Sequence, residues 1–220
     1  MTLVIGHGGA SAVATANTLR SFDAARDAGA DMIEFDVRSA RGRLVLAHLG
    51  SSALRRSCLT LDDALSHLSE PGFSRVALNV DVKVPGYERE TLGALRAHGL
   101  TERSLISSQW GCVVERVREL DPAVSTAISV GGRLSRRSQR WAPRTWRRAV
   151  LTALAAGRFG DAMVQHKVIT PDFADAVAAT GRRLFAWTVD DPVRFAELAR
   201  LGVAGVTTGD PGALRAGVAS

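Results

Sequence analysis

Short apolar runs that end in a polar residue alternate along the chain with segments whose apolar residues recur at helical spacing. The first run, Leu3 to Gly6, is rich in β-branched residues and ends at His7. This pattern is typical of a buried parallel strand with a polar tip. Asn17 and Gly29 then bracket an apolar helical face, so we expect a helix with Asn17 as its N-cap and Gly29 as its stop signal.

The same alternation continues to the end of the chain. We predict nine strands, at residues 3–6, 32–40, 44–47, 76–82, 104–108, 124–130, 162–165, 183–189 and 203–207, and helices near 19–28, 60–68, 87–98, 112–120, 171–179 and 192–201. Alternating strands and helices indicate an α/β fold with a parallel sheet. We predict a TIM (β/α)8 barrel forming a single domain over residues 1–220, although one strand is surplus near residues 32–48. An open doubly wound sheet is the alternative, disfavoured because polar residues end many different strands.

The stretch from Met32 to His48 organises the candidate chemistry. Glu34 and Asp36 are two residues apart in an apolar run, so on a strand both side chains point to one face. Two buried carboxylates repel each other, and a hard divalent ion such as Mg²⁺ or Ca²⁺ would relieve that repulsion. The alternative is an ordinary strand with an acidic face. A second apolar run, residues 44–47, is followed directly by His48.

Composition narrows the compartment and the partner. The chain has 220 residues and a net charge of +6, with Lys83 and Lys167 as its lysines. Excess positive charge favours a phosphate-bearing partner without choosing among nucleic acid, anionic membrane and phosphorylated small molecules. Cys58 and Cys112 lack metal-type spacing, so we expect free thiols. We also expect neither a signal peptide nor a membrane span, and therefore a cytoplasmic protein.

The polar motifs at the strand ends, taken in order, resemble those of the glycerophosphodiester phosphodiesterase family. That family shows His-Arg-Gly-Ala, Glu-Asn-Thr, Glu-x-Asp, His-Asp, Glu-x-Lys and Trp-Thr-Val in this order. The matching segments are HGGA at 7–10, ANT at 16–18, EFD at 34–36, HL at 48–49, DVK at 81–83, WTV at 187–189 and GVTT at 205–208. Each motif is weak alone, and their joint order is specific.

The resemblance implies a TIM barrel with its site at the carboxyl ends of the strands. It implies metal ligation by Glu34, Asp36 and Asp81, and acid/base catalysis by the pair His7 and His48. It further implies a phosphate contact from Lys83, a pocket wall at Trp187, and attack by a neighbouring substrate hydroxyl to give a cyclic phosphate. From their places after strands, we add Gln109 and His166 as substrate-binding candidates. The expected substrates are small-molecule glycerophosphodiesters or lysophospholipids.

Three positions depart from the family pattern. Gly8 stands where the family has Arg, Leu49 where it has Asp, and Asp81 where it has Glu. The segment between His48 and Thr60 is also too short for the family's usual inserted subdomain, which predicts an open mouth. Two alternatives therefore stay open: a lyase similar to sphingomyelinase D that releases a cyclic phosphate from lipid headgroups, and a barrel that binds phosphorylated ligands or lipid without turnover.

A basic segment lies between Gly131 and Gly160. Its arginines are interleaved with Trp141 and Trp146 on a potential amphipathic helix. Such a helix can be simply solvated, can guide a phosphorylated substrate, or can make peripheral contact with an anionic membrane. No nucleic-acid recognition motif accompanies the charge, so we expect no nucleic-acid partner.

Overall fold

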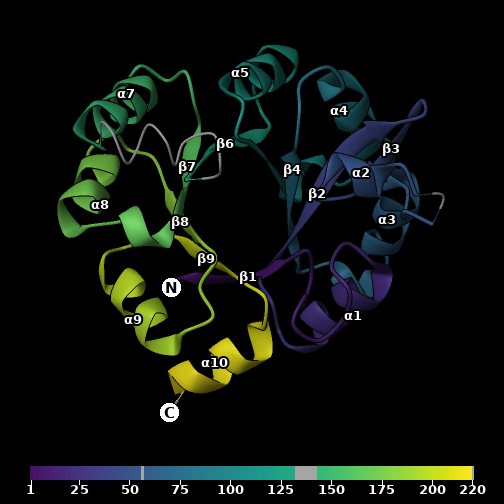
Figure 1. Ribbon diagram of the computed structural model, residues 1–220, viewed down its shortest axis with the longest axis horizontal. Coiled ribbons are helices and arrows are strands. Elements are labelled where there is room, and N and C mark those ends of the chain that lie inside the picture. Colours follow the sequence, from purple (N-terminus) through teal and green to yellow (C-terminus); the bar gives the residue numbers. More distant parts are fainter. Residues whose placement is uncertain (56, 132–142, 220) are drawn as a thin grey trace.

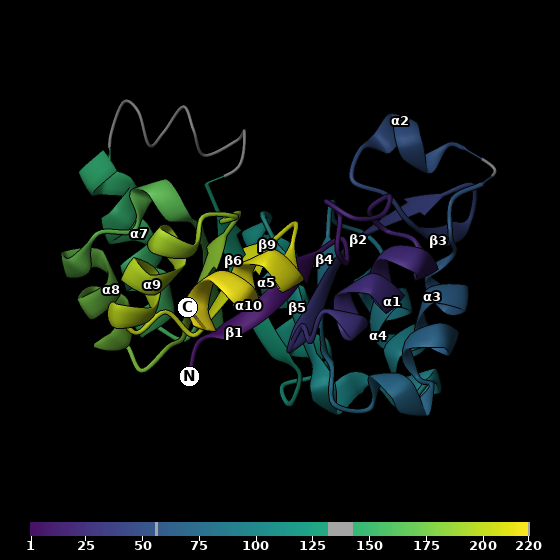
Figure 2. The same ribbon diagram turned by 90° about the horizontal axis from the view of Figure 1, so that it is seen from below.

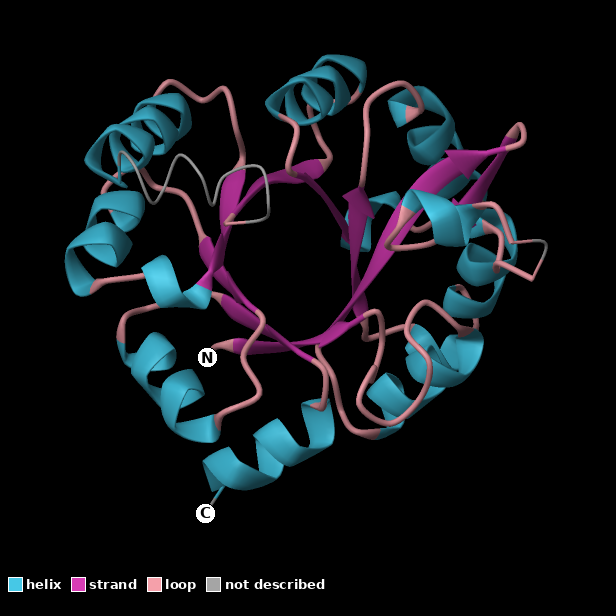
Figure 3. Cartoon of the chain, viewed as in Figure 1, coloured by secondary structure: helices cyan, strands magenta, loops and turns pink. Residues whose placement is uncertain are grey.

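The computed structural model describes residues 1–55, 57–131 and 143–219. Nine strands form one sheet in the order β1-β9-β8-β7-β6-β5-β4-β2-β3, and pairing of β1 with β2 closes all of them except β3 into a parallel barrel (Figures 1 and 3). The strands are β1 Leu3–His7, β2 Met32–Ala40, β3 Arg43–Leu46, β4 Ala77–Val82, β5 Ser104–Ser108, β6 Ser125–Val130, β7 Asp161–Gln165, β8 Leu184–Trp187 and β9 Gly205–Thr208. The predicted TIM barrel is confirmed, and the open sheet is rejected.

The surplus strand is β3, which lies outside the barrel. It pairs antiparallel with the end of β2, with Val37 opposite Leu46 and Ala40 opposite Arg43. The hairpin turns at Arg41 and Gly42, whose φ angles of 52° and 75° are both left-handed. A hairpin of this kind needs no crossover helix, which explains why two predicted strands follow each other directly.

Helices surround the barrel (Figure 1). They are α1 Leu19–Asp27, α2 Gly50–Ala53, α3 Leu61–Leu68, α4 Glu88–Ala97, α5 Gly111–Leu120, α7 Pro143–Ala155, α8 Pro171–Ala178, α9 Pro192–Arg200 and α10 Pro211–Ala219, with short 3-10 turns at Pro71–Phe73, Thr101–Arg103 and His166–Val168. The sequence pattern did not predict α2 or α10. No described helix combines the length and the apolar character that crossing a membrane requires.

Of the two helix signals predicted for the first helix, the stop at Gly29 is confirmed and the N-cap at Asn17 is wrong. Thr60 caps α3 by accepting a hydrogen bond from the Asp63 amide, and Gly29 ends the first helix with a φ of 76°. The N-cap of α1 is Thr18, whose hydroxyl accepts from the Ser21 amide, and not Asn17. The side chain of Asn17 is directed instead to β2, as described below.

Strand alternation divides the buried residues into two layers. Outward side chains of the strands, such as Phe35 and Val80, pack under the helices in the main core. Inward side chains fill the barrel axis with a smaller apolar cluster, made of Ile5, Met32, Leu105, Ala127, Met163 and Phe185. Each large side chain that is fully buried contributes roughly 1.5–3 kcal/mol to stability. The barrel is therefore a packed body, and ligands can reach it only beyond this cluster, at the end of its axis.

The carboxyl ends of the parallel strands meet at one end of the barrel. Figure 2 shows α2 beyond the strands at this end, on the side of β2 and β3. The predicted membrane contact through residues 131–160 falls partly on residues 132–142, which lie outside the described residues. The described part of that segment contains α7, which packs on α8 through a stacked pair of rings from Trp146 and Phe173.

Candidate active site

Period-2 alternation brings polar side chains from almost every barrel strand to one cavity. On each strand, the inward positions beyond the apolar axis cluster reach the carboxyl end of the barrel. The cavity there has a volume of about 100 Å³ and is lined by His7, Glu34, His48, Asn79, Asp81, Lys83, Ser107, Gln109, Ser129, Met163, Trp187 and Thr207. Nearly all of the predicted site residues therefore lie around a single space.

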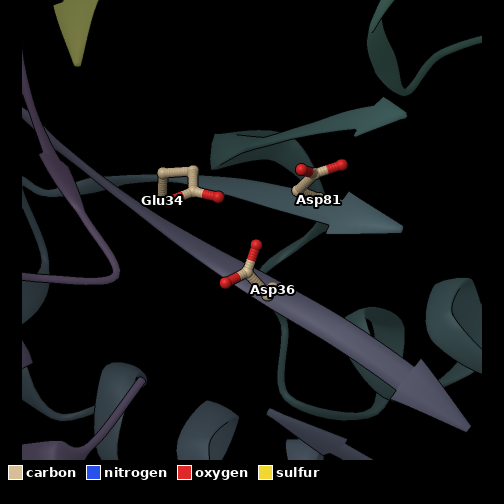
Figure 4. A group of neighbouring side chains, drawn as sticks. All are labelled: Glu34, Asp36 and Asp81. Carbon is tan, nitrogen blue, oxygen red and sulfur yellow. The ribbon is translucent and has the colours of Figure 1, made fainter. Parts of the chain in front are cut away.

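Three carboxyl groups lie together beside this cavity. Glu34 and Asp36 belong to β2, and Asp81 lies opposite Asp36 on the neighbouring strand β4 (Figure 4). Each offers an oxygen, and these oxygens lie within 4.8 Å of one another. All three residues are buried. Asp81 Oδ1 finds no hydrogen-bond partner among the described residues. A buried oxygen-only donor set with an unsatisfied oxygen suits a hard divalent cation.

Lys83 lies against the same acidic cluster. Its Nζ donates to Asp81 Oδ2 at 2.5 Å and also forms an ion pair with Asp36. Burial alone would lower the pKa of the Lys83 ammonium, but the charges of Asp81, Asp36 and Glu34 outweigh burial and raise it. The resemblance implied a phosphate contact at this position. In the structure the ammonium pairs with these carboxylates and also lines the cavity, and its contact with a phosphate stays a prediction.

The three acids differ in their electrostatic environments. Burial, followed by the nearby charge of Asp36, raises the pKa of Glu34 well above its usual value. Burial likewise raises the pKa of Asp81. For Asp36 burial acts in the same direction, but hydrogen bonds and charge from His48, Lys83 and Asn17 outweigh it and lower the pKa. Asp36 is thus the carboxylate most strongly held in its charged form.

Backbone and amide groups of the β1–α1 loop fix the acids of β2. The Gly8 amide donates to Glu34 Oε2 at 2.9 Å. Asn17 Nδ2 donates to Asp36 Oδ2 at 2.8 Å, and the Asp36 amide donates back to Asn17 Oδ1 at 3.0 Å. Asn17 adopts a left-handed φ of 61°, which Asn tolerates better than most residues. The loop therefore holds both carboxylates before any ligand binds.

The two predicted catalytic histidines both line the cavity. His7, at the tip of β1, places Nδ1 3.3 Å from the Thr188 hydroxyl and Nε2 4.0 Å from Glu34 Oε2. Burial lowers the pKa of the His7 imidazole. His48 places Nδ1 3.4 Å from both carboxylate oxygens of Asp36, and its side chain is 64% exposed. The histidines thus face the acidic cluster from two places, the tip of β1 and the loop between β3 and α2.

Of the remaining predicted substrate-binding residues, two line the cavity and one does not. Gln109 and Trp187 are both lining residues, whereas His166 is absent from the lining. His166 lies in a 3-10 turn, His166–Val168, that follows β7 directly, and its contact with substrate stays a prediction. Its carbonyl accepts a hydrogen bond from Arg194, which ties this turn to α9.

Sequence reasoning missed several lining residues, namely Asn79, Ser107, Ser129, Met163 and Thr207. Each lies at an inward position of its strand, so extending the period-2 pattern from Asp81 and Glu34 to every strand would have identified them. Asn17 was missed as a partner of Asp36 because its place before a helix is equally typical of an N-cap.

Comparison with known proteins agrees with this arrangement. The model of the glycerophosphoryl diester phosphodiesterase family matches residues 7–57 and 57–213. A glycerophosphodiester phosphodiesterase of Caldanaerobacter subterraneus is 24% identical over 247 aligned residues, which cover 96% of this chain and 95% of that protein.

Solved structures give the same result for the fold. A glycerophosphodiester phosphodiesterase from Agrobacterium tumefaciens has a TM-score of 0.77 at 19% identity and covers 100% of both chains. A phosphodiesterase from Oleispira antarctica, solved with the product sn-glycerol-3-phosphate, has a TM-score of 0.77 at 20% identity and covers 100% of this chain and 98% of that one.

Proposed function

Because the chain belongs to the glycerophosphoryl diester phosphodiesterase family, we propose that it is a phosphoric diester hydrolase acting on glycerophosphodiesters. The observation that carries this proposal is the gathering of three buried carboxyl groups, one lysine and two histidines in and beside a single cavity. This set of groups matches the chemistry of an anionic diester, whose cleavage gathers negative charge on phosphoryl oxygens and on a leaving alkoxide.

Glu34, Asp36 and Asp81 would hold a divalent metal ion, Mg²⁺ or Ca²⁺. When bound, the ion supplies positive charge to the phosphoryl oxygens as a Lewis acid. Lys83 contributes a second positive charge next to the same cavity. In this proposal the Lys83 ammonium stays paired with Asp81 and also contacts the phosphate from the edge of the cavity.

His7 and His48 divide the proton transfers. His7, whose pKa is lowered by burial, is neutral near pH 7 and accepts the proton of the attacking hydroxyl. His48 is oriented through Nδ1 by Asp36, which leaves Nε2 to donate a proton to the leaving alkoxide. Attack by the neighbouring hydroxyl of the glycerol gives a cyclic phosphate, and attack by water on this intermediate gives the monoester. One proton is taken and one is returned in each half of the reaction.

We extend the substrate range to lysophospholipids, with the enzyme in the cytoplasm and in peripheral contact with the membrane. The open mouth expected from the short segment after His48, the basic net charge of +6 and the absence of a spanning helix among the described residues support this extension. Cys58 and Cys112 are both free, which fits a reducing compartment.

The decisive experiment measures hydrolysis of glycerophosphocholine before and after chelation. We expect chelation to abolish activity and Mg²⁺ or Ca²⁺ to restore it, with phosphorus NMR distinguishing a ring-opened monoester from a cyclic end product. No hydrolysis with either metal would overturn the proposal. A cyclic end product would favour the lyase alternative instead.

A substrate with an activated leaving group tests the division of roles. His48→Ala should lower kcat about 10²–10⁴-fold on an alkyl diester and much less on a p-nitrophenyl diester, which needs no acid. His7→Ala should lower kcat on both substrates. Equal losses for His48→Ala on the two substrates would contradict its role as the acid.

A further inference from the structure

A second cleft opens directly beside the cavity. It lies between the loop before α1 and the segment that contains α2, and its volume is about 500 Å³. We name it the His48 groove, and its lining residues are Thr15, Ala16, Asn17, Thr18, Leu19, Leu46, Ala47, His48, Ser52, Arg55, Ser57, Cys58 and Leu59. His48 lines both the groove and the acidic cavity. A diester whose phosphate occupies the cavity can therefore extend one substituent past His48 into the groove.

The lining of the groove is selective in its chemistry. Apolar side chains, including Leu19, Leu46 and Leu59, form much of its wall, and hydroxyl groups border them. Arg55 is its cation, and none of the lining residues carries a carboxylate. A trimethylammonium or ammonium headgroup would find no carboxylate and no Phe, Tyr or Trp ring among these lining residues. An apolar chain would find contact surface, and the volume falls within the range of about 300–1,000 Å³ that is usual for ligand sites.

The surface next to the groove has the same character. Leu49 and Leu54, which flank α2, are 55% and 56% exposed although both are large and apolar. Residues 37–61, which include the groove wall and α2, contain five arginines and no acidic residue. Exposed leucines beside several arginines are typical of a surface that meets an anionic lipid–water boundary. Lipid is also the source of phosphodiesters that carry an acyl chain.

We infer that the His48 groove binds the acyl chain of a lysophospholipid. This inference rests on the proposed phosphodiesterase function and adds a specificity site to it. Cleavage remains the same reaction: water ultimately adds across the phosphorus–oxygen bond of the headgroup alcohol, which leaves with one proton, and the acylglycerol phosphate is the second product.

A chain-length series on the wild-type enzyme tests the inference without any substitution. Each methylene transferred from water to an apolar site is worth roughly a fourfold change in affinity. Lysophosphatidylcholines with acetyl, butanoyl, hexanoyl and octanoyl chains, all below their micellar concentrations, should therefore show kcat/KM rising by about that factor per methylene. Glycerophosphocholine, which has the same headgroup and no chain, is the reference substrate. A flat series would overturn the inference.

Variants that fill the groove give the second arm. Ala16→Trp and Ser57→Trp introduce bulk from the two sides of the groove at exposed positions. We expect each to lower, at least tenfold, the ratio of kcat/KM for octanoyl lysophosphatidylcholine to that for glycerophosphocholine. Val193→Trp is the matched control, because Val193 is 66% exposed at the start of α9 and is not a groove residue. Its ratio should equal that of the wild type.

The outcomes separate the inference from the proposed function. An unchanged ratio in both groove variants, with glycerophosphocholine still hydrolysed, would overturn the acyl-chain site alone. Failure of the wild type to hydrolyse glycerophosphocholine with either metal would overturn the proposed function, and the inference with it. The groove variants could instead change kcat/KM according to the headgroup of the substrate and not according to its acyl chain. That outcome would assign the groove to the leaving alcohol and would also overturn the inference.

Discussion

Asn17 and Asp36 are joined by two reciprocal hydrogen bonds. The Asn17 amide nitrogen donates to Asp36 Oδ2 at 2.8 Å, while the Asp36 backbone amide donates to Asn17 Oδ1 at 3.0 Å. Both residues are buried. The pair links the β1–α1 loop to β2, the strand that carries two of the three clustered acids. The position of the Asp36 carboxylate therefore depends on Asn17, which does not line the cavity itself.

Replacing Asn17 should weaken metal binding more than a surface substitution would. In both Asn17→Ala and Asn17→Gly we expect the metal concentration for half-maximal activity to rise about 10–100-fold, because residues that orient ligands have effects of that size. Direct titration calorimetry of Mg²⁺ binding gives a readout that does not depend on turnover. An unchanged metal requirement in both variants would contradict a positioning role for Asn17.

The two Asn17 variants also control for each other. Both lose the hydrogen bonds to Asp36, which should cost about 2–3 kcal/mol in the free energy of unfolding. Alanine has a Cβ atom and is strained at a φ of 61°, whereas glycine is not. Asn17→Ala should therefore be about 1 kcal/mol less stable than Asn17→Gly. Chemical denaturation measures the difference. Equal stabilities would show that the left-handed backbone carries no strain in the alanine variant.

Strand periodicity explains which parts of the site were predictable. Glu34 with Asp36, and Asp81 with Lys83, are pairs two residues apart, and the alternation of a strand puts each pair on one face without any tertiary information. The alternation of strands and helices likewise predicted the barrel. The pairing of Asn17 with Asp36 was not predictable, because it depends on a loop crossing the end of a strand 19 residues away. The 3-10 turn after Gln165 was not predictable either, because its hydrogen bond to Arg194 is also a tertiary contact.

Lys83 should stabilise the metal-free protein by neutralising Asp36 and Asp81. Lys83→Met leaves these two carboxylates buried without their counter-ion, and removal of one partner from a buried ion pair costs about 3–5 kcal/mol. Thermal denaturation in the presence of a chelator should therefore show a large loss of stability. Added Mg²⁺ should raise the melting temperature more in Lys83→Met than in the wild type.

The chain offers a matched control in its other lysine. Lys167 is exposed, and Lys167→Met should change the free energy of unfolding by no more than about 0.5 kcal/mol with or without metal. If Lys83→Met proved as stable as Lys167→Met in chelator, the ammonium would not be the counter-charge of the acidic cluster.

The acid limb of the pH profile of kcat/KM should have its midpoint below the ordinary histidine pKa of 6.5. Burial lowers the pKa of His7 from 6.5, so the neutral imidazole that the proposed base requires persists below that pH. A cation in the acidic cluster would lower the pKa further. We expect kcat/KM at saturating metal to fall with a midpoint below 6.5 as the pH decreases. The same limb should remain in His48→Ala, and a midpoint above 6.5 would contradict the prediction.

The same shift has a consequence for stability, and its sign is fixed. Since the pKa of His7 is lower in the folded state than in the unfolded chain, the unfolded chain binds more protons below pH 6.5. The His7 contribution to stability is thus present above pH 6.5 and is lost as the pH falls through the folded-state pKa. Comparing the wild type with His7→Gln between pH 5 and 8 isolates this contribution.

Gly8 is required by the local backbone, whatever its consequence for phosphate binding. Its φ is +60°, and a Cβ at this position would lie 2.7 Å from the Cβ of Ala16. Gly8→Ala should therefore combine left-handed strain with a steric clash. Gly42 has a φ of +75° with nothing within 4 Å of an added Cβ, so Gly42→Ala measures the strain alone, about 1 kcal/mol. We expect Gly8→Ala to be less stable than Gly42→Ala by a further 1–3 kcal/mol or so, the usual cost of overpacking.

The double variant Gly8→Ala/Ala16→Gly resolves the two components. Removing the Ala16 methyl group eliminates the clash and leaves only the backbone strain. Once the effect of Ala16→Gly alone is subtracted, the loss of unfolding free energy in the double variant should agree with that in Gly42→Ala to within about 0.5 kcal/mol. The Gly8 amide also donates to Glu34 Oε2, so a backbone shift in Gly8→Ala should raise the metal requirement as well. Equal stability of Gly8→Ala and Gly42→Ala would mean that the loop accepts a side chain here. In that case the arginine of the family motif could be restored at position 8, and its absence would reflect substrate choice and not the geometry of the loop.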